Sequence, residues 1–143
     1  MGAVDVNQIL ITPLQRINLV EGDVLHGIKH SDSGYVGFGE AYFSILKNGA
    51  IKAWKRHLHM TLNLVVPIGS VQIVFIDESG AFREEIVGEE RYVRITVPPG
   101  LWFGLHGLYD PYSLLMNMAD IPHDPNEVER RAIDEINFDW RNS

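Results

Sequence analysis

Three basic side chains, Lys55, His57 and His59, lie at alternate positions within residues 50–63. Alternate side chains of an extended strand share one face, so a strand here would direct all three into the same space. An imidazole titrates near neutral pH, and a lysine beside other cations in an apolar pocket has its pKa lowered towards that range. Removing a proton beside a ketone needs a base, and a cation that holds the enolate oxygen. Lys55 and His57 are therefore the predicted catalytic residues.

Two other interpretations of the histidines stay open at this point. His57 and His59 could be core histidines that hydrogen-bond their neighbours. They could also bind a metal ion, because His-x-His is a spacing found in metal-binding barrels. Such a site would normally add a carboxylate and a later histidine, whereas this chain has Asn63 and Phe103 at those places. We therefore predict no metal ion and no other cofactor.

Five further residues are predicted to bind substrate: Lys52, His59, Asn63, Trp102 and His106. Trp102 could stack on a ring of the ligand, although large aromatic side chains more often belong to a core. His106 follows the Pro-Pro-Gly turn at 98–100 and could face the same cavity.

The spacing of the two lysines adds a geometric condition. Lys52 and Lys55 are three positions apart, so in a regular strand they would face opposite sides. Both can reach one ligand only if the strand bulges between them or the ligand spans a rim.

The charged residues are distributed unevenly along the chain. The 143 residues carry a formal net charge of −7, which argues against a general nucleic-acid-binding protein. From Ala41 to Ile76, however, there is no Asp or Glu, while lysine, arginine and histidine are frequent. A basic island in an acidic protein would suit an anionic ligand. The alternative is that buried strands simply exclude carboxylates.

Short apolar runs predict an all-β protein. Strands are expected at Gly39–Leu46, Ile51–Val66 and Ser70–Ile76, among others, with turns of Gly, Pro and Asp between them. Many short strands of this kind favour a jelly-roll barrel or sandwich. Only Pro125–Ile133 looks helical, with Asp124 as its cap, so the chain is expected to end in a short helix or a coil tail.

The bulk composition is that of an ordinary globular protein, with 45% hydrophobic and 22% charged residues. The length predicts a single domain over residues 1–143. No cysteine is present, which excludes disulfides and thiolate metal sites. No apolar run approaches the roughly 18 residues of a membrane span, and no signal pattern opens the chain. We expect a cytoplasmic protein that is not anchored in a membrane.

The chain resembles the short, cupin-type proteins grouped with dTDP-4-dehydrorhamnose 3,5-epimerase. The likeness runs in order and with few gaps through the segments Gly39–Phe43, Ile51–Trp54, Met60–Asn63, Val97–Trp102, Pro122–Pro125 and Asn137–Trp140. The resemblance implies a cupin (jelly-roll) fold, a homodimer, no metal ion, and a nucleotide-sugar substrate made for surface polysaccharide or deoxysugar synthesis.

The epimerases carry an Arg-Gly-Leu-His motif, in which the arginine contacts the nucleotide phosphates and the histidine is the catalytic base. This chain has Lys52-Ala53-Trp54-Lys55 there. By this resemblance, Lys52 would meet a phosphate as a point charge, and Lys55 would replace the base. The short relatives usually carry histidine at the position of Lys55 and again at that of His57, so His57 fits their pattern.

Two other functional positions of the epimerases differ in this chain. The acid tyrosine falls on Met116, which cannot donate a proton, and an arginine of an early turn falls on Glu21. These departures argue against double 3,5-epimerisation.

Two functional hypotheses follow. The first is a nucleotide-sugar (dTDP-, CDP- or GDP-4-keto-6-deoxy sugar) epimerase or ketoisomerase. The second is a non-catalytic cupin that binds a sugar nucleotide or glycan as a regulatory or assembly module.

Overall fold

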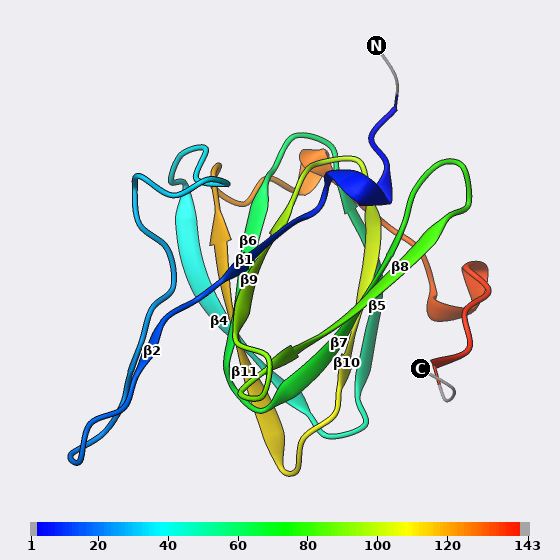
Figure 1. Ribbon diagram of the computed structural model, residues 1–143. Coiled ribbons are helices and arrows are strands. Elements are labelled where there is room, and N and C mark those ends of the chain that lie inside the picture. Colours follow the sequence, from blue (N-terminus) through cyan, green and yellow to red (C-terminus); the bar gives the residue numbers. More distant parts are fainter. Residues whose placement is uncertain (1–2, 141–143) are drawn as a thin grey trace.

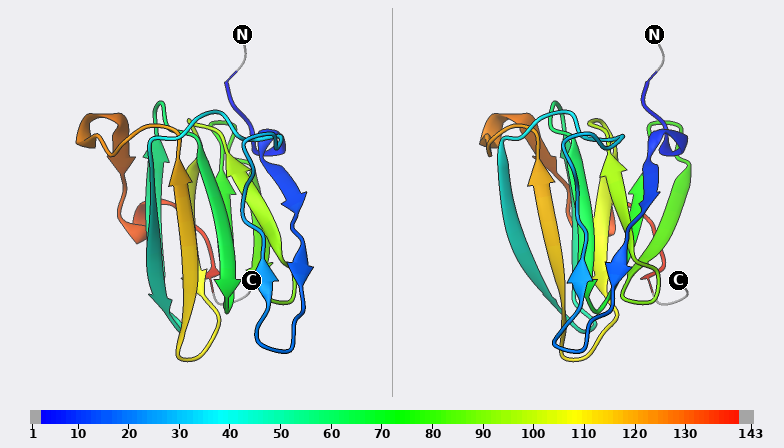
Figure 2. Two further views of the ribbon diagram at one scale, coloured as in Figure 1. Left: turned by 90° about the vertical axis from the view of Figure 1, so that its left-hand side faces the viewer. Right: turned by 60° about the vertical axis from the view of Figure 1, so that its left-hand side comes forward.

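The computed structural model describes residues 3–140, and its strands form two facing antiparallel sheets (Figures 1 and 2). The first sheet has the strand order β1-β9-β6-β11-β4, with the bounds Leu10–Pro13, Val93–Val97, Leu62–Ile68, Tyr112–Ala119 and Glu40–Lys47. The second has the order β12-β5-β10-β7-β8, with the bounds Val128–Arg130, Ile51–His57, Trp102–Gly107, Ser70–Ile76 and Phe82–Gly88. The all-β, jelly-roll prediction is confirmed.

The remaining elements are short. Strands β2 (Arg16–Ile17) and β3 (Val24–Leu25) pair into an arm that projects from the sandwich (Figure 1). Three 3₁₀ turns, η1, η2 and η3, span Val6–Gln8, Pro125–Glu127 and Ile133–Glu135. None of the helical turns in residues 3–140 has the length or the apolar character to cross a membrane.

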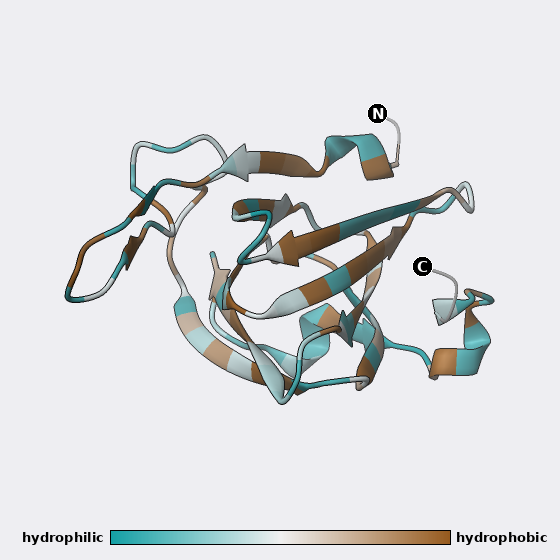
Figure 3. Cartoon of the chain, turned by 60° about the horizontal axis from the view of Figure 1, so that its bottom comes forward, coloured by the Kyte–Doolittle hydropathy of each residue, from teal (hydrophilic) through white to brown (hydrophobic). Residues whose placement is uncertain are grey.

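Alternating side chains build the core between the sheets. Figure 3 shows hydrophobic and hydrophilic residues taking turns along several strands. On β6, Leu62, Leu64 and Val66 point inwards, and they pack with Ile73 and Phe75 of β7. Strand side chains alternate between faces, so one apolar set fills the space between two sheets.

A second apolar cluster lies on the outside of the second sheet. Trp54, Val74 and Trp102 pack there against Ile136 and Trp140 of the C-terminal segment. That segment therefore covers a sheet face that would otherwise expose several aromatic rings.

Two expected elements differ from the structure. The strand expected at Ile51–Val66 is two strands, β5 and β6, because the chain turns between His57 and Leu62 to cross from one sheet to the other. The prediction of a helix at Pro125–Ile133 is wrong. Only one 3₁₀ turn forms, capped by Asp124 as predicted, and the chain then extends as β12 along the edge of β5.

Candidate functional site

A β-bulge in β5 brings Lys52 and Lys55 to the same face. Lys55 pairs with Phe103 of β10, but the next pair is Ala53 with Gly104, so Trp54 is the extra residue. Trp54 turns outwards to the aromatic cluster, with 2% of its surface exposed. An extra residue shifts the alternation by one, which is the condition the sequence set for both lysines to reach one ligand.

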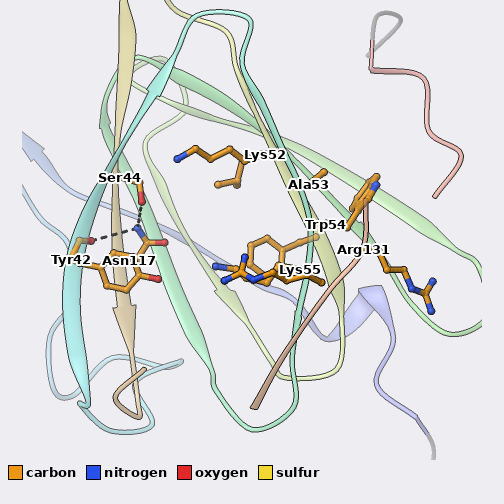
Figure 4. A pocket seen from close by; sticks show the side chains of 11 residues that line it. Tyr42, Ser44, Lys52, Ala53, Trp54, Lys55, Asn117 and Arg131 are labelled. Carbon is orange, nitrogen blue, oxygen red and sulfur yellow. Dashed lines mark hydrogen bonds between the residues drawn. The ribbon is translucent and has the colours of Figure 1, made fainter. Parts of the chain in front are cut away.

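The two lysines line a cavity of about 390 Å³ at the open side of the sandwich, which we call the main cavity. Figure 4 shows both lysines reaching from β5 towards Tyr42, Ser44 and Asn117. Asn117 Nδ2 donates to Ser44 Oγ at 3.1 Å, which ties β11 to β4. The main cavity thus has a cationic wall and a polar, uncharged wall.

Two further side chains complete the walls of the main cavity. Arg130 of β12 lies opposite Lys55 in the register of β12 and β5 and lines the cavity beside it. Phe103 contributes an aromatic surface, and Lys55 Nζ lies 5.7 Å from the centre of its ring. Two or more cations around a partly apolar cavity are the features expected of a site for a phosphate-bearing ligand.

His57 forms a buried pair with Glu127. The two side chains are 70 residues apart in sequence, and His57 Nδ1 lies 2.5 Å from Glu127 Oε1. The other carboxylate oxygen accepts the backbone N–H groups of His59 and Met60, each at 3.2 Å. Glu127 therefore holds the ring with Nδ1 as the donor, which leaves Nε2 as the basic nitrogen.

The electrostatics favour a neutral imidazole and an ionised carboxylate. Burial lowers the pKa of His57 and outweighs the hydrogen bond and charge of Glu127, which raise it. Burial by itself would raise the pKa of Glu127, but the hydrogen bonds from His57 and the backbone bring it below its usual value. At neutral pH His57 can accept a proton at Nε2.

The surroundings of Lys55 lower the pKa of its ammonium group. Burial is the main cause of its lowered pKa; the charges of Arg130 and Lys52 add to the effect, and Glu127 opposes it. Tyr42, across the cavity, has a raised pKa because of burial and the charge of Glu40, so its phenol stays protonated. The site therefore offers a base, a cation and a neutral proton donor.

A smaller cavity of about 190 Å³ adjoins the main one, since Tyr42, Lys55 and Arg130 line both. His57 and Glu40 line the smaller cavity. His57 Nε2 and Glu40 Oε1 are buried, and neither has a hydrogen-bond partner within residues 3–140.

Two predicted substrate-binding residues lie on the other side of the second sheet. Trp102 and His106 alternate with Phe103 and Leu105 along β10, and it is the latter pair that lines the main cavity. Trp102 is covered by the guanidinium groups of Arg56 and Arg131, and His106 Nδ1 pairs with Gln72. The prediction for these two residues is corrected, because the alternation of β10 turns them outwards.

His59 and Asn63 also lie apart from both cavities. His59 follows the end of β5, is exposed, and takes part in the site only through its backbone N–H. Asn63 is buried on the outer side of β6, where its Oδ1 accepts from Arg94 Nε and Thr96 Oγ1. The expected convergence of three basic groups is thus reduced to Lys55 and His57, since the strand ends before His59.

Two of the positions where this chain departs from the epimerase pattern, Met116 and Glu21, also lie away from both cavities. Met116 lies between the inward residues Leu115 and Asn117 of β11 and lines neither cavity. Asn117 is the β11 side chain that reaches the main cavity. Glu21 is exposed on the loop between β2 and β3.

Sequence reasoning did not find Glu40, Tyr42, Asn117, Glu127 or Arg130. Two of these, Glu40 and Tyr42, carried a usable signal, because they alternate on a predicted strand and so share a face. The position of Glu127, just past Asp124-Pro125, gave no sign that its carboxylate is 3% exposed and paired to a histidine. Only the pairing of β12 with β5 places it there.

No family model matches the chain. Among curated proteins it is similar to a probable low-salt glycan biosynthesis epimerase of Haloferax volcanii, with 27% identity over 100 residues. That match spans 65% of this chain and 64% of the curated relative, so less than two thirds of the relative's length is matched.

Among solved structures the chain is similar to a dTDP sugar isomerase from Desulfovibrio desulfuricans G20, with 32% identity and a TM-score of 0.90 over 96% of this chain and 94% of that one. A dTDP-6-deoxy-D-glucose-3,5-epimerase from Legionella pneumophila shares the fold at 14% identity and a TM-score of 0.79, over 96% of this chain and 81% of that one. A sugar 3,4-ketoisomerase from Thermoanaerobacterium thermosaccharolyticum does so at 16% identity and a TM-score of 0.76, over 92% and 96%. This chain therefore belongs to the dTDP-sugar isomerase family, among the cupins that resemble dTDP-4-dehydrorhamnose 3,5-epimerase.

Proposed function

We propose that the protein is a nucleotide-sugar epimerase or isomerase that moves a proton at the carbon beside a keto group. The observation that carries this proposal is the His57–Glu127 pair, in which His57 lines a cavity shared with Lys55. A carboxylate-held imidazole is a general base, and a nearby ammonium can stabilise an enolate. The curated relative's name, a glycan biosynthesis epimerase, and that of the dTDP sugar isomerase agree with this chemistry.

Each wall of the site has its own part in the reaction. His57 takes the proton from carbon, and Lys55 holds the oxygen on which negative charge develops. Tyr42, on the opposite wall, can return a proton from the other side, which a change of configuration requires. One side chain thus removes the proton while another stabilises the enolate, so the two groups can act in the same transition state.

The cations of the main cavity are suited to the diphosphate of the substrate. Lys52 and Arg130 line it, and neither forms an ion pair with a carboxylate within the described part of the chain. Charged donors to phosphate are stronger than neutral ones, and they supply binding that does not depend on the reacting carbon. The substrate class is therefore a dTDP-, CDP- or GDP-linked 4-keto-6-deoxy sugar, used for polysaccharide or deoxysugar synthesis in the cytoplasm.

The protein is also proposed to work as a homodimer. The outer face of the first sheet carries an apolar row, in which Ile45 of β4 pairs with Leu114, and Leu114 pairs with Ile68. Phe43, on the same face of β4, is 65% exposed and Ile45 is 58% exposed. A second copy of this chain would remove that row from water. Ile45→Lys should then convert the dimer into a monomer in light scattering, whereas Ile86→Lys on β8 should not.

Incubation with dTDP-4-keto-6-deoxyglucose in D₂O, followed by NMR, tests the catalytic proposal. The wild-type protein should place deuterium on a carbon next to the keto group. His57→Asn should slow that exchange by at least about 100-fold, the usual contribution of a general base.

His106→Asn is the matched control, because this histidine lies on the outer face of β10 and should leave exchange unchanged. Absence of deuterium from all three sugar nucleotides, dTDP-, CDP- and GDP-linked, would refute the enzymatic proposal. Tight nucleotide binding without exchange would instead identify a non-catalytic sugar-nucleotide-binding protein.

A further inference from the structure

Asn117 presents an unpaired carboxamide oxygen to the main cavity. The residue is only 6% exposed, and it lines the cavity from β11. Its Nδ2 lies 3.1 Å from Ser44 Oγ and 3.5 Å from the backbone carbonyl oxygens of Tyr42 and Leu115. A carbonyl oxygen can only accept, so the nitrogen must be the end of the amide that faces these atoms. Oδ1 is the other end, and no group within residues 3–140 donates to it.

Ser44 adds a donor beside that acceptor. Its Oγ accepts from Asn117, so its own hydrogen is left to donate, and no acceptor for it lies in the described part of the chain. Asn117 Oδ1 is also open to solvent, unlike the closed-off atoms His57 Nε2 and Glu40 Oε1. The polar wall of the main cavity therefore offers one acceptor and one donor to whatever the cavity holds.

The chemistry of this pair restricts the group that can satisfy it. Buried polar groups in native proteins nearly always have a partner. A hydroxyl group suits both atoms, because it can donate to Asn117 Oδ1 and accept from Ser44 Oγ through one oxygen. A phosphate, a keto oxygen or a ring oxygen can only accept, so each would leave Asn117 Oδ1 unpaired. The wall is therefore suited to a hydroxyl group of the ligand.

The pair lies towards one end of the site. Tyr42 and Lys55 line both cavities, whereas Ser44, Asn117 and Lys52 line the main cavity only. Figure 4 shows Ser44 and Lys52 towards one end of the main cavity and Tyr42 and Lys55 towards the other. On β4, Ser44 follows Tyr42 by two residues, which is about 6.5 Å along a strand. The hydroxyl group in question is thus displaced from the reacting carbonyl towards Lys52.

A 4-keto-6-deoxy sugar has few groups that meet this condition. Only C2 and C3 carry hydroxyl groups, since C1 bears the diphosphate, C4 the carbonyl and C5 the ring oxygen, and C6 is a methyl group. The C3 hydroxyl adjoins the carbonyl, which the proposed function puts at Lys55 and Tyr42. The C2 hydroxyl adjoins C1, whose diphosphate the proposed function puts at Lys52. C2 therefore carries the hydroxyl group on the side where the donor–acceptor pair lies.

We propose that Asn117 and Ser44 bind the hydroxyl group at C2 of the sugar and so select substrates that carry a free hydroxyl group there. This inference rests on the proposed function and adds a pair of specificity-determining residues to it. The sugars that the pair rejects are those with hydrogen or an acetamido group at C2.

An acetamido group also contains a donor and an acceptor, but it cannot use both on this wall. A secondary amide is planar and trans, so its N–H and C=O groups point in opposite directions. If the N–H faced Asn117 Oδ1, the carbonyl would face away from Ser44. A 2-deoxy sugar leaves both protein groups unpaired, and a site built to bind a hydroxyl group discriminates against an analogue that lacks it.

Calorimetry with unreactive sugar nucleotides tests the proposal on the wild-type protein. We expect dTDP-2,6-dideoxyglucose to bind at least about 10-fold more weakly than dTDP-6-deoxyglucose, because two polar groups lose their partner. This comparison does not depend on the folding of a variant. Equal affinity for the two ligands would overturn the proposal.

The same pair of ligands identifies the residues. In Asn117→Leu the ratio of the two affinities should fall to about 2-fold or less, since a bond that the protein cannot make is not lost again with the ligand. Ser44→Ala should lower the ratio in the same direction and changes the fold less. Asn48→Leu is the matched control, because Asn48 is exposed on the turn before β5 and lies outside both cavities. A wild-type ratio in both cavity variants would assign the C2 hydroxyl to other residues.

Binding of dTDP alone checks that the wall contacts the sugar and not the nucleoside, which also carries donors. The Kd for dTDP should stay within about 2-fold of the wild-type value in Asn117→Leu and Ser44→Ala, the limit for sites that do not interact. If dTDP bound as much more weakly as dTDP-6-deoxyglucose did, the nucleoside would lie against this wall and the proposal would be overturned.

Hydrogen exchange in D₂O separates this inference from the proposed function. Wild-type kcat/KM for exchange should be at least about 10-fold lower with the 2-acetamido analogue of dTDP-4-keto-6-deoxyglucose than with that sugar itself. Exchange at equal rates would overturn the role of the pair and leave the epimerase or isomerase in place. Discrimination at C2 in calorimetry without any exchange would support the pair and refute the enzymatic proposal. If the wild-type protein bound neither sugar nucleotide, both proposals would fail.

Discussion

His57 Nδ1 and Glu127 Oε1 lie 2.5 Å apart, although 70 residues separate them in sequence. The turn η2 presents the carboxylate, and β12 fixes it by pairing Val128 with His57. The end of the chain thus supplies the group that orients the proposed base, and a strand at the edge of the sheet becomes part of the site.

Replacement of Glu127 by Gln should lower kcat by about 10- to 100-fold, by analogy with the loss of a carboxylate that orients a metal-binding histidine. The hydrogen bond and charge of Glu127 raise the pKa of His57. Without them, the acid limb of the kcat/KM profile should move to lower pH, an effect that a purely structural role would not produce. Glu129→Gln is the control, because Glu129 pairs with Arg56 on the outer face. An unshifted acid limb would argue against a direct role for Glu127.

The pH dependence of wild-type kcat/KM should be bell-shaped. Burial lowers the pKa of His57, so the acid limb should lie below the ordinary histidine value of about 6.5. Burial and neighbouring cations lower the pKa of Lys55, so activity should fall in the alkaline range before about 10.4. Lys55→Arg should remove the alkaline limb, since a guanidinium group keeps its charge there. An alkaline limb unchanged in Lys55→Arg would assign it to another group.

Protonation of His57 also bears on stability. Its pKa in the folded state is lowered, so between that value and about 6.5 the unfolded chain binds more protons than the folded one. The free energy of unfolding should therefore rise with pH through this window and decrease as pH falls below about 6.5. Urea unfolding at a series of pH values would measure this, and His57→Gln should flatten the slope. An equal slope in both proteins would contradict the assignment.

Removal of the cavity cations should weaken nucleotide binding more than catalysis. Lys52→Gln and Arg130→Gln should each raise the Kd for dTDP by about 10-fold, in keeping with the loss of one charge-assisted hydrogen bond. The matched control is Lys47→Gln, at the exposed end of β4. Calorimetry at low and high salt checks the origin of the effect, because the difference between variant and wild type should shrink as salt rises. Unchanged affinity in both variants would place the phosphates elsewhere.

We expect that Gly104 is needed for the C-terminal segment to pack on the outer aromatic cluster. A Cβ at this position would lie 2.7 Å from the Cβ of Ala53 and 3.0 Å from Trp140. Gly104→Ala should therefore lower the free energy of unfolding by about 1–3 kcal/mol, the range for overpacking. Gly27→Ala is the control, because its added Cβ would meet only Met116, at 3.6 Å. A thermal unfolding scan measures both, and equal Tm values would show that the C-terminal segment adapts.

The sequence by itself determined the strands and the family. Alternating apolar residues and Gly, Pro and Asp turns predicted the jelly roll, since the two-residue period of a strand is local. The basic residues of β5 predicted a proton-transfer site, and the ordered motifs predicted the family, which the comparison confirmed.

Tertiary structure decided which side chains meet. The sequence from Trp102 to His106 could not show which side chains of β10 point inwards. Both faces of the strand are partly apolar, because the C-terminal segment covers the outer one. The bulge at Trp54 depends on the register with β10. The segment after Asp124 became a strand because β5 offered it an unpaired edge. Contacts of this kind are made between distant parts of the chain, and a local pattern carries no record of them.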